Sequence, residues 1–177
     1  MRKNMIIAGS GGQGVISLAI LLANAYGIYE NYEVAQTQSY GAQARGGASQ
    51  ASLVISDQPI DYIEVDSADI FVAFNEAGFK KYLPKAKEEA IFFIDSTLVS
   101  EELYQSFPNV YTIPATDIAE HQFRLFMANV VMMGFMAAVL NNVSIDSLKR
   151  VIAEQLPPKA YEQNVAALMA GYERGLC

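Results

Sequence analysis

The chain has 177 residues, the length of one ordinary domain, and we expect a single domain over 1–177. Hydrophobic residues make up 52% of the chain and charged residues 18%, a composition that excludes disordered and fibrous proteins. Twelve Lys and Arg against nineteen Asp and Glu give a formal net charge of −7. This excess of negative charge opposes the phosphate contacts on which nucleic-acid binding depends, so we expect no nucleic-acid partner.

Cysteine and histidine are too scarce for a metal centre. The chain has one cysteine, Cys177, and one histidine, His121. One cysteine cannot form an intramolecular disulfide or hold an iron–sulfur cluster, and the pair lacks the ligand spacing of a zinc site. The apolar stretch near the N-terminus is too short for a signal peptide. We therefore expect a cytoplasmic protein that holds no metal of its own.

The first two thirds of the chain alternate short apolar runs with helical segments. Six segments are predicted to be strands, at 4–8, 33–37, 48–56, 69–74, 90–94 and 109–113. Helices are predicted at 15–26 and 76–88. This alternation is typical of an α/β fold, with a Rossmann-like, largely parallel sheet and helices on both faces.

The rest of the chain predicts a helical C-terminal part, with helices at 117–141, 144–155 and 158–174. Residues 125–140 contain no charge, but this segment is shorter than the ~20 residues that span a membrane, and no membrane partner is expected. A helix so apolar on every face is either a central core helix or partly covered by another subunit. Both interpretations stay open at this point.

A first glycine-rich segment follows the first predicted strand and opens the first helix. It reads Gly9-Ser10-Gly11-Gly12-Gln13-Gly14 and matches the pattern G-x-G-x-x-G. Such a turn directs backbone N–H groups and a helix N-terminus toward an anion, although a tight turn for helix packing has the same pattern. The second strand ends in Ala-Gln-Thr-Gln at 35–38, without the carboxylate that a nicotinamide site requires. We therefore expect no NAD(H) binding.

A second segment, 39–47, is also rich in glycine and contains an arginine. Its candidate residues are Tyr40, Gly41, Arg45, Gly46 and Gly47. Arg45 offers a permanent charge and five N–H donors to a phosphate or carboxylate. We expect this loop to lie beside the first one at the carboxyl edge of the sheet, so that the two segments line one cleft. In the alternative, Arg45 is structural and pairs with a carboxylate such as Asp57.

No convincing catalytic group is found. His121 lies in a polar stretch without a Cys or a Gly-x-Ser-x-Gly elbow nearby, which is typical of a surface histidine. Asp95 and Asn75-Glu76 end predicted strands, where functional residues gather, but Asp95 also suits a helix cap. Asn129, within the apolar segment, must find a hydrogen-bond partner in the core or at an interface.

Several motifs together resemble the gamma subunit of 2-oxoacid:ferredoxin oxidoreductases, over essentially the whole chain. They are GSGGQGV at 9–15, SYGAQARGG at 39–47, LVISDQPI at 53–60, NVVMMGF at 129–135 and the closing NVAALMAGYERG. The form YGAQARGG is more similar to the 2-oxoglutarate branch than to the indolepyruvate branch. Gln43 stands where many members have an acidic residue.

The resemblance implies a subunit of an enzyme that oxidatively decarboxylates a 2-oxoacid to an acyl-CoA and passes electrons to ferredoxin. Thiamine diphosphate, magnesium and iron–sulfur clusters are then expected in partner alpha and beta subunits, or in a delta subunit, and none in this chain. The two glycine-rich segments become candidates for a cleft that takes CoA or substrate. A homodimer of the isolated chain, a free-standing nucleotide- or dinucleotide-binding protein and a purely structural assembly partner remain as alternatives.

Overall fold

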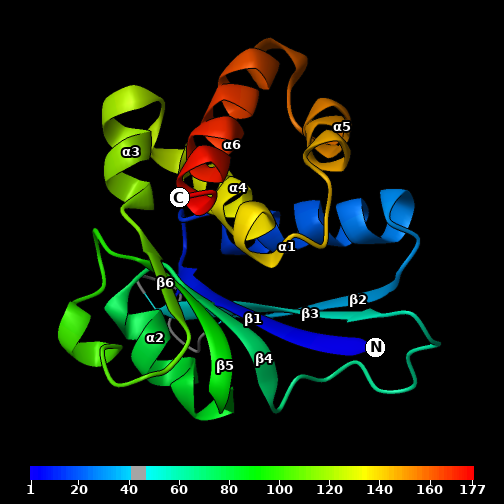
Figure 1. The fold of residues 1–177 in the computed structure, drawn as a ribbon, viewed down its shortest axis with the longest axis vertical. Coiled ribbons are helices and arrows are strands. Elements are labelled where there is room, and N and C mark those ends of the chain that lie inside the picture. The colour runs from blue at the N-terminus through cyan, green and yellow to red at the C-terminus, as the bar shows by residue number, and fades with distance from the viewer. Residues whose placement is uncertain (41–46) are drawn as a thin grey trace.

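The computed structural model describes residues 1–40 and 47–177 (Figure 1). Six strands form one sheet: β1 (Arg2–Ser10), β2 (Glu33–Tyr40), β3 (Ala48–Ser56), β4 (Ala68–Ala73), β5 (Ala86–Asp95) and β6 (Val110–Ile113). Their order across the sheet is β2-β3-β1-β4-β5-β6. Every strand predicted from the sequence is present, and β1, β2 and β5 are longer than predicted.

The sheet is largely parallel, as predicted, but one strand runs against the others. β1 is parallel to β4, β4 to β5 and β5 to β6, whereas β3 is antiparallel to both of its neighbours, β1 and β2. The connection from Tyr40 to Ala48 is too short for a crossover helix, so β2 and β3 pair as a hairpin. β3 consequently separates β2 from β1.

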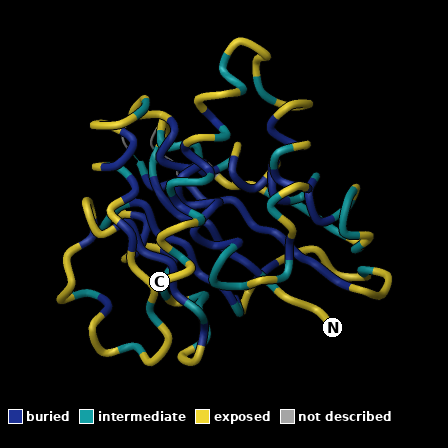
Figure 2. Tube along the Cα trace, turned by 45° about the horizontal axis from the view of Figure 1, so that its top comes forward, coloured by how far each residue is buried: buried dark blue, intermediate teal, exposed yellow. Residues whose placement is uncertain are grey.

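Helices cover both faces of this sheet, which confirms the predicted α/β architecture with a helical C-terminal part (Figure 1). α2 (Glu76–Tyr82) lies on one face. The other face carries α1 (Val15–Asn24), with a π-helical turn (Ala25–Tyr29) after it, and α3 (Ala115–Gln122), α4 (Ala128–Leu140), α5 (Ile145–Gln155) and α6 (Tyr161–Gly175). Figure 2 shows the strands as the most deeply buried part and the outer turns of the helices as exposed.

Two predicted helices differ from the structure. The segment 76–88 is helical only to Tyr82, because Pro84 follows in a 3₁₀ turn and β5 already starts at Ala86. The segment 117–141 is two helices, since Phe123 leaves the helical conformation at φ −135° and ψ −121°. A continuous helix there would be about 37 Å long. A 3₁₀ turn, Leu125–Met127, lies between α3 and α4.

The apolar segment 125–140 is a core helix of the chain itself. All residues of α4 from Ala128 to Ala137 are buried within the single chain. Leu125 and Phe126, in the 3₁₀ turn before α4, are 57% and 64% exposed. The core interpretation of this segment is therefore confirmed for α4, while the turn before it stays on the surface.

α4 and α6 touch through their backbones at two glycines. A Cβ atom at Gly134 would lie 1.9 Å from the carbonyl oxygen of Leu168, and one at Gly171 would lie 1.8 Å from that of Val131. These distances are far below an ordinary contact, so only glycine fits at either position. The pair of helices forms the centre of the C-terminal part.

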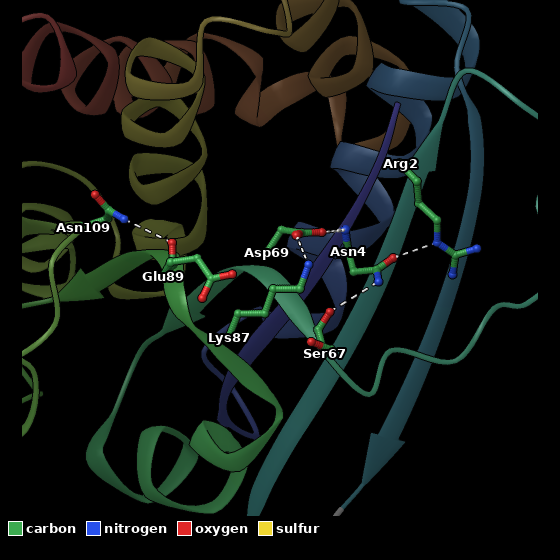
Figure 3. A network of polar contacts seen from close by, with 7 residues as sticks. All are labelled: Arg2, Asn4, Ser67, Asp69, Lys87, Glu89 and Asn109. Carbon is green, nitrogen blue, oxygen red and sulfur yellow. Dashed lines mark hydrogen bonds and ion pairs between the residues drawn. The ribbon is translucent and has the colours of Figure 1, made fainter.

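At the amino edge of the sheet, polar side chains join β1, β4 and β5 (Figure 3). The carboxylate of Asp69 accepts a hydrogen bond from the Asn4 backbone N–H at 2.8 Å and pairs with Lys87 Nζ at 2.5 Å. Burial alone would raise the pKa of Asp69, but the hydrogen bonds from Lys87 and Asn4 outweigh it and leave this pKa below its ordinary value. The amino edge of the sheet, opposite the glycine-rich segments, is therefore stabilised by the contacts of Asp69 with Asn4 and Lys87.

No helix in the described part of the chain combines the length and the apolar composition needed to cross a membrane.

Candidate functional site

The first glycine-rich segment forms the turn between β1 and α1 at the carboxyl edge of the sheet. Gly12 and Gly14 have positive φ angles of 88° and 73°, a conformation that favours glycine. Gly11 and Gly12 are exposed, and a Cβ at either would meet no heavy atom within 4 Å. Gly14 is the N-cap of α1 and has no side chain to cap the helix, and a helix N-terminus attracts an anion.

The side chain of Gln13 connects the turn between β1 and α1 to the end of the parallel strand β4. Its Oε1 atom accepts hydrogen bonds from the Ser10 backbone N–H at 2.8 Å and from Asn75 Nδ2 at 3.1 Å. Its Nε2 atom donates to the carbonyl oxygen of Phe74 at 3.3 Å. The side chain therefore acts as a clamp between the ends of β1 and β4, a role that the sequence pattern alone did not reveal.

Loss of this clamp is expected to destabilise the chain. Gln13→Leu leaves the partly buried Ser10 N–H without its acceptor and removes one of the two acceptors of the Asn75 amide, so we expect the free energy of unfolding to fall by about 1–3 kcal/mol. Chemical denaturation of the purified variant measures this change. Gln163→Leu, on the exposed surface of α6, is the matched control and should leave stability within about 0.5 kcal/mol. Equal stability of both variants would contradict the clamp.

Asn75 extends the same contacts to α2. Its Oδ1 atom accepts the N–H of Gly78 at 2.8 Å and caps the helix, while its Nδ2 atom donates to Ser10 Oγ at 2.6 Å. A Cβ at Gly78 would lie 2.6 Å from the backbone nitrogen of Gly9, so α2 rests directly on the end of β1. The sequence indicated Asn75 as a candidate because it follows a predicted strand. It gave no indication that α2 approaches β1 closely at Gly78.

The second glycine-rich segment starts and ends at the same edge of the sheet. Tyr40, the last residue of β2, pairs with Ser49, and Ala48, the first residue of β3, pairs with Ser10 of β1. Gly47, just before β3, is partly buried. The candidates Gly41, Arg45 and Gly46 lie outside the described residues. The register thus brings the described ends of the second segment next to the first one.

Asn129 connects the start of α4 to the first glycine-rich segment. Its Nδ2 atom donates to the carbonyl oxygen of Gly14 at 3.3 Å, and its Oδ1 atom accepts the N–H of Val130 at 2.9 Å. A Cβ at Gly14 would lie 2.4 Å from Nδ2. Of the two roles expected for Asn129, the structure shows the core contact.

The contacts of Asp95 and His121 stabilise local structure. The fully buried carboxylate of Asp95 accepts hydrogen bonds from the Thr97 N–H at 3.1 Å and from Thr116 Oγ1 at 2.6 Å, and so caps the start of α3. Burial raises the pKa of Asp95, although these hydrogen bonds act in the opposite direction. His121 is exposed and contacts the carbonyl oxygen of Asp117 at 2.9 Å. The surface interpretation is confirmed for His121. Asp95 is not the N-cap of a helix that follows it, because residues 96–99 form a turn, and its carboxylate instead accepts hydrogen bonds from the start of α3.

The described part of the site offers amides, hydroxyls and backbone N–H groups. Within residues 1–40 and 47–177, no three His, Cys, Asp or Glu side chains gather in a group that could hold a metal ion. Ser10, Gln13 and Asn75 have no acid–base function near neutral pH. Such an arrangement can bind an anionic ligand.

Comparison with known proteins agrees with the fold and the motifs. Residues 4–174 match the family model described as pyruvate ferredoxin/flavodoxin oxidoreductase. The chain is 39% identical to the 2-oxoglutarate synthase subunit KorC of Methanocaldococcus jannaschii, with 98% of this chain and 94% of that protein covered. It is 31% identical to the pyruvate synthase subunit PorC of Methanothermobacter marburgensis, with 94% and 93% covered.

Solved structures show the same relationship. The keto/oxoacid ferredoxin oxidoreductase gamma subunit of Geobacter sulfurreducens superposes with a TM-score of 0.84 at 30% identity, covering 99% of this chain and 97% of that one. A 2-oxoglutarate:ferredoxin oxidoreductase from Magnetococcus marinus, solved with 2-oxoglutarate, coenzyme A and succinyl-CoA, gives a TM-score of 0.81 at 25% identity, covering 98% of this chain and 30% of that one. The chain therefore belongs to the pyruvate ferredoxin/flavodoxin oxidoreductase family and is a gamma-type subunit of a 2-oxoacid:ferredoxin oxidoreductase.

Proposed function

We propose that this subunit acts as one domain over 1–177 in a CoA-dependent 2-oxoglutarate:ferredoxin oxidoreductase, where it forms part of the CoA-binding cleft. The pairing of Ser10 with Ala48 is the observation that carries this proposal. It brings the two glycine-rich segments to one edge of the sheet, next to the start of α1. The candidate residues of the cleft are Gly9, Gly11, Gly12, Gln13, Gly14, Tyr40, Gly41, Arg45, Gly46 and Gly47.

The chemistry of CoA fits this edge. CoA carries a diphosphate and a 3′-phosphate, and the exposed turn at Gly11 and Gly12 opens a helix whose first N–H groups are free to face an anion. The choice of 2-oxoglutarate follows the similarity to the KorC subunits, and the choice of CoA follows the ligands of the Magnetococcus marinus relative. Family membership as a subunit makes a free-standing dinucleotide-binding protein the weaker alternative.

Redox chemistry is assigned to the partner subunits in this proposal. Thiamine diphosphate, magnesium and the iron–sulfur clusters bind there, and ferredoxin accepts the electrons there. This chain supplies contacts to the alpha, beta and delta subunits and to the nucleotide end of CoA. Leu125 and Phe126, which the single chain leaves exposed beside the start of α4, are its contribution to such an assembly surface.

The isolated chain is expected to show no turnover. In an assay with 2-oxoglutarate, CoA and a viologen dye, the purified chain should give the background rate, while addition of the partner subunits restores dye reduction. Omission of CoA from the complete mixture is the control, because it separates 2-oxoacid-dependent reduction from acyl transfer. Turnover by the chain alone would refute the assignment of the redox cofactors to the partners.

A further inference from the structure

A groove lies beside β6, the last strand of the sheet. Its volume is about 390 Å³, and it is open to solvent. Its lining consists of Glu101, Tyr104, Gln105, Phe107, Val110 and Thr112. These residues belong to β6 and to the segment 101–107 before it. The groove is therefore at the lateral edge of the sheet, whereas the glycine-rich segments are at its carboxyl edge.

β6 presents unpaired backbone groups at this groove. Among the described strands, β5 is its one partner. The carbonyl oxygens of Asn109 and Ile113 accept N–H groups of β5 and of the turn after it, at 2.8 and 3.0 Å. Because backbone groups alternate in direction along a strand, the N–H and C=O groups of Val110 and Thr112 point away from the sheet. The two residues with free backbone groups are thus the two residues of β6 that line the groove.

The groove combines a fixed aromatic ring with a hydroxyl that lacks a partner. The ring of Phe107 packs on that of Phe92, with centroids 4.5 Å apart. Tyr104 is 9% exposed, and no residue of the described ranges forms a hydrogen bond with its hydroxyl. Buried tyrosine hydroxyls normally have a partner. This hydroxyl keeps some accessible surface, so a group that enters the groove can reach it.

The charge of the groove is negative. Glu101 and Glu102 are both exposed in the 3₁₀ turn Glu101–Leu103, and Glu101 lines the groove. Neither carboxylate forms an ion pair with any residue that the structure describes. The lining residues include no Lys or Arg. A carboxylate, a free hydroxyl and an aromatic ring together suit the guanidinium group of an arginine.

We propose that an extended segment of a partner subunit pairs with the outer edge of β6 and places an arginine in this groove. Its backbone bonds to the outward N–H and C=O groups of Val110 and Thr112. Its guanidinium group pairs with Glu101, donates to the hydroxyl of Tyr104 and packs on Phe107. A second copy of this chain is a poor occupant, because it would bring another acidic groove and another net charge of −7 to the contact.

Hydrogen exchange tests the added strand. In the isolated chain, the amides of Val110 and Thr112 should exchange rapidly, whereas those of Tyr111 and Ile113, which face β5, should exchange slowly. In the assembled oxidoreductase, exchange at Val110 and Thr112 should slow by about tenfold or more. Unchanged exchange at these two residues would overturn the strand addition.

Glu101→Lys tests the basic occupant. We expect it to weaken the affinity for the partner subunits by about tenfold or more, measured by titration of the chain, labelled at its exposed Cys177, with the purified partners. Tyr104→Phe removes only the unpartnered hydroxyl, so it should weaken the affinity by about threefold to tenfold without lowering the melting temperature.

Glu173→Lys is the matched control for charge. It makes the same change in net charge at an exposed position of α6, which covers the opposite face of the sheet from α2 (Figure 1). A Glu101→Lys chain that binds its partners as tightly as Glu173→Lys would refute the proposal. Neither titration contains CoA, so the result is independent of the proposed CoA cleft.

Cross-linking in the assembled enzyme identifies the occupant. Gln105, an exposed residue of the lining, is replaced by the photoreactive amino acid p-benzoylphenylalanine. On irradiation, it should link to a partner-subunit peptide that contains an arginine, as read by mass spectrometry. A link to a second copy of this chain, or the absence of any link to a partner subunit, would contradict the inference.

Discussion

Gly171→Ala is expected to lower the free energy of unfolding by about 3 kcal/mol. The new Cβ atom would lie 1.8 Å from the carbonyl oxygen of Val131, and a backbone atom of a buried helix cannot move aside as a side chain would. Overpacking lowers stability by about 1–3 kcal/mol where neighbouring side chains can move to make room. The loss is larger where two helices, here α4 and α6, must move apart. Alanine returns only about 1 kcal/mol through its better helix propensity.

Denaturation curves and the melting temperature measure this loss, which corresponds to a decrease of about 6–12 °C. Ala166→Gly, on the exposed face of α6, is the control for helix propensity and should cost about 1 kcal/mol. Because Gly134 faces the same helix contact, Gly134→Ala combined with Gly171→Ala should cost less than the sum of the two single changes. A stabilised Gly171→Ala variant would show that the helices separate without penalty.

Arg45→Gln is expected to raise the KM of the assembled enzyme for CoA by about one to two powers of ten. The glutamine keeps much of the stem but removes the charge, and a hydrogen bond from a charged group to a phosphate is worth about 1.5–3 kcal/mol. We expect the flanking glycines Gly46 and Gly47 to allow backbone N–H groups to reach the same anion. Reduction of the cofactors by 2-oxoglutarate before CoA is added should hardly change, because it precedes the step that needs CoA.

Arg45→Lys is the conservative variant and should recover only part of the affinity, since a point charge cannot replace the planar guanidinium. Steady-state kinetics at varied CoA, with stopped-flow reduction in its absence, separate binding from chemistry. An Arg45→Gln variant whose subunits no longer assemble, or whose KM for CoA stays at the wild-type value, would show that the arginine is structural. A structural partner for Arg45 would then have to be a group other than Asp57, because Asp57 follows the opposite end of β3 and pairs with the N-terminal amine of Met1 at 2.6 Å.

The sequence predicted the part of the candidate site that depends on local backbone conformation, the glycine-rich turn at 9–14. Gly12 and Gly14 occupy backbone positions that glycine prefers, and a glycine-rich turn between a strand and a helix is a local pattern. Gln13 and Gln50 show the limit of this approach. Gln13 holds the ends of two strands together, whereas Gln50 Oε1 is buried and has no donor among the described residues, and this difference depends on residues distant in the chain.

The sequence by itself determined the α/β class, the positions of the six strands and the family, because these depend on apolar periodicity and on short motifs within one segment. The tertiary structure alone decided that β3 also pairs with β1 and so separates it from β2, and that 117–141 breaks at Phe123. It also decided that Gly134 and Gly171 meet across two helices. Each of these features depends on which surfaces pack together, and the packing partners lie too far apart in the chain for any local pattern to encode them.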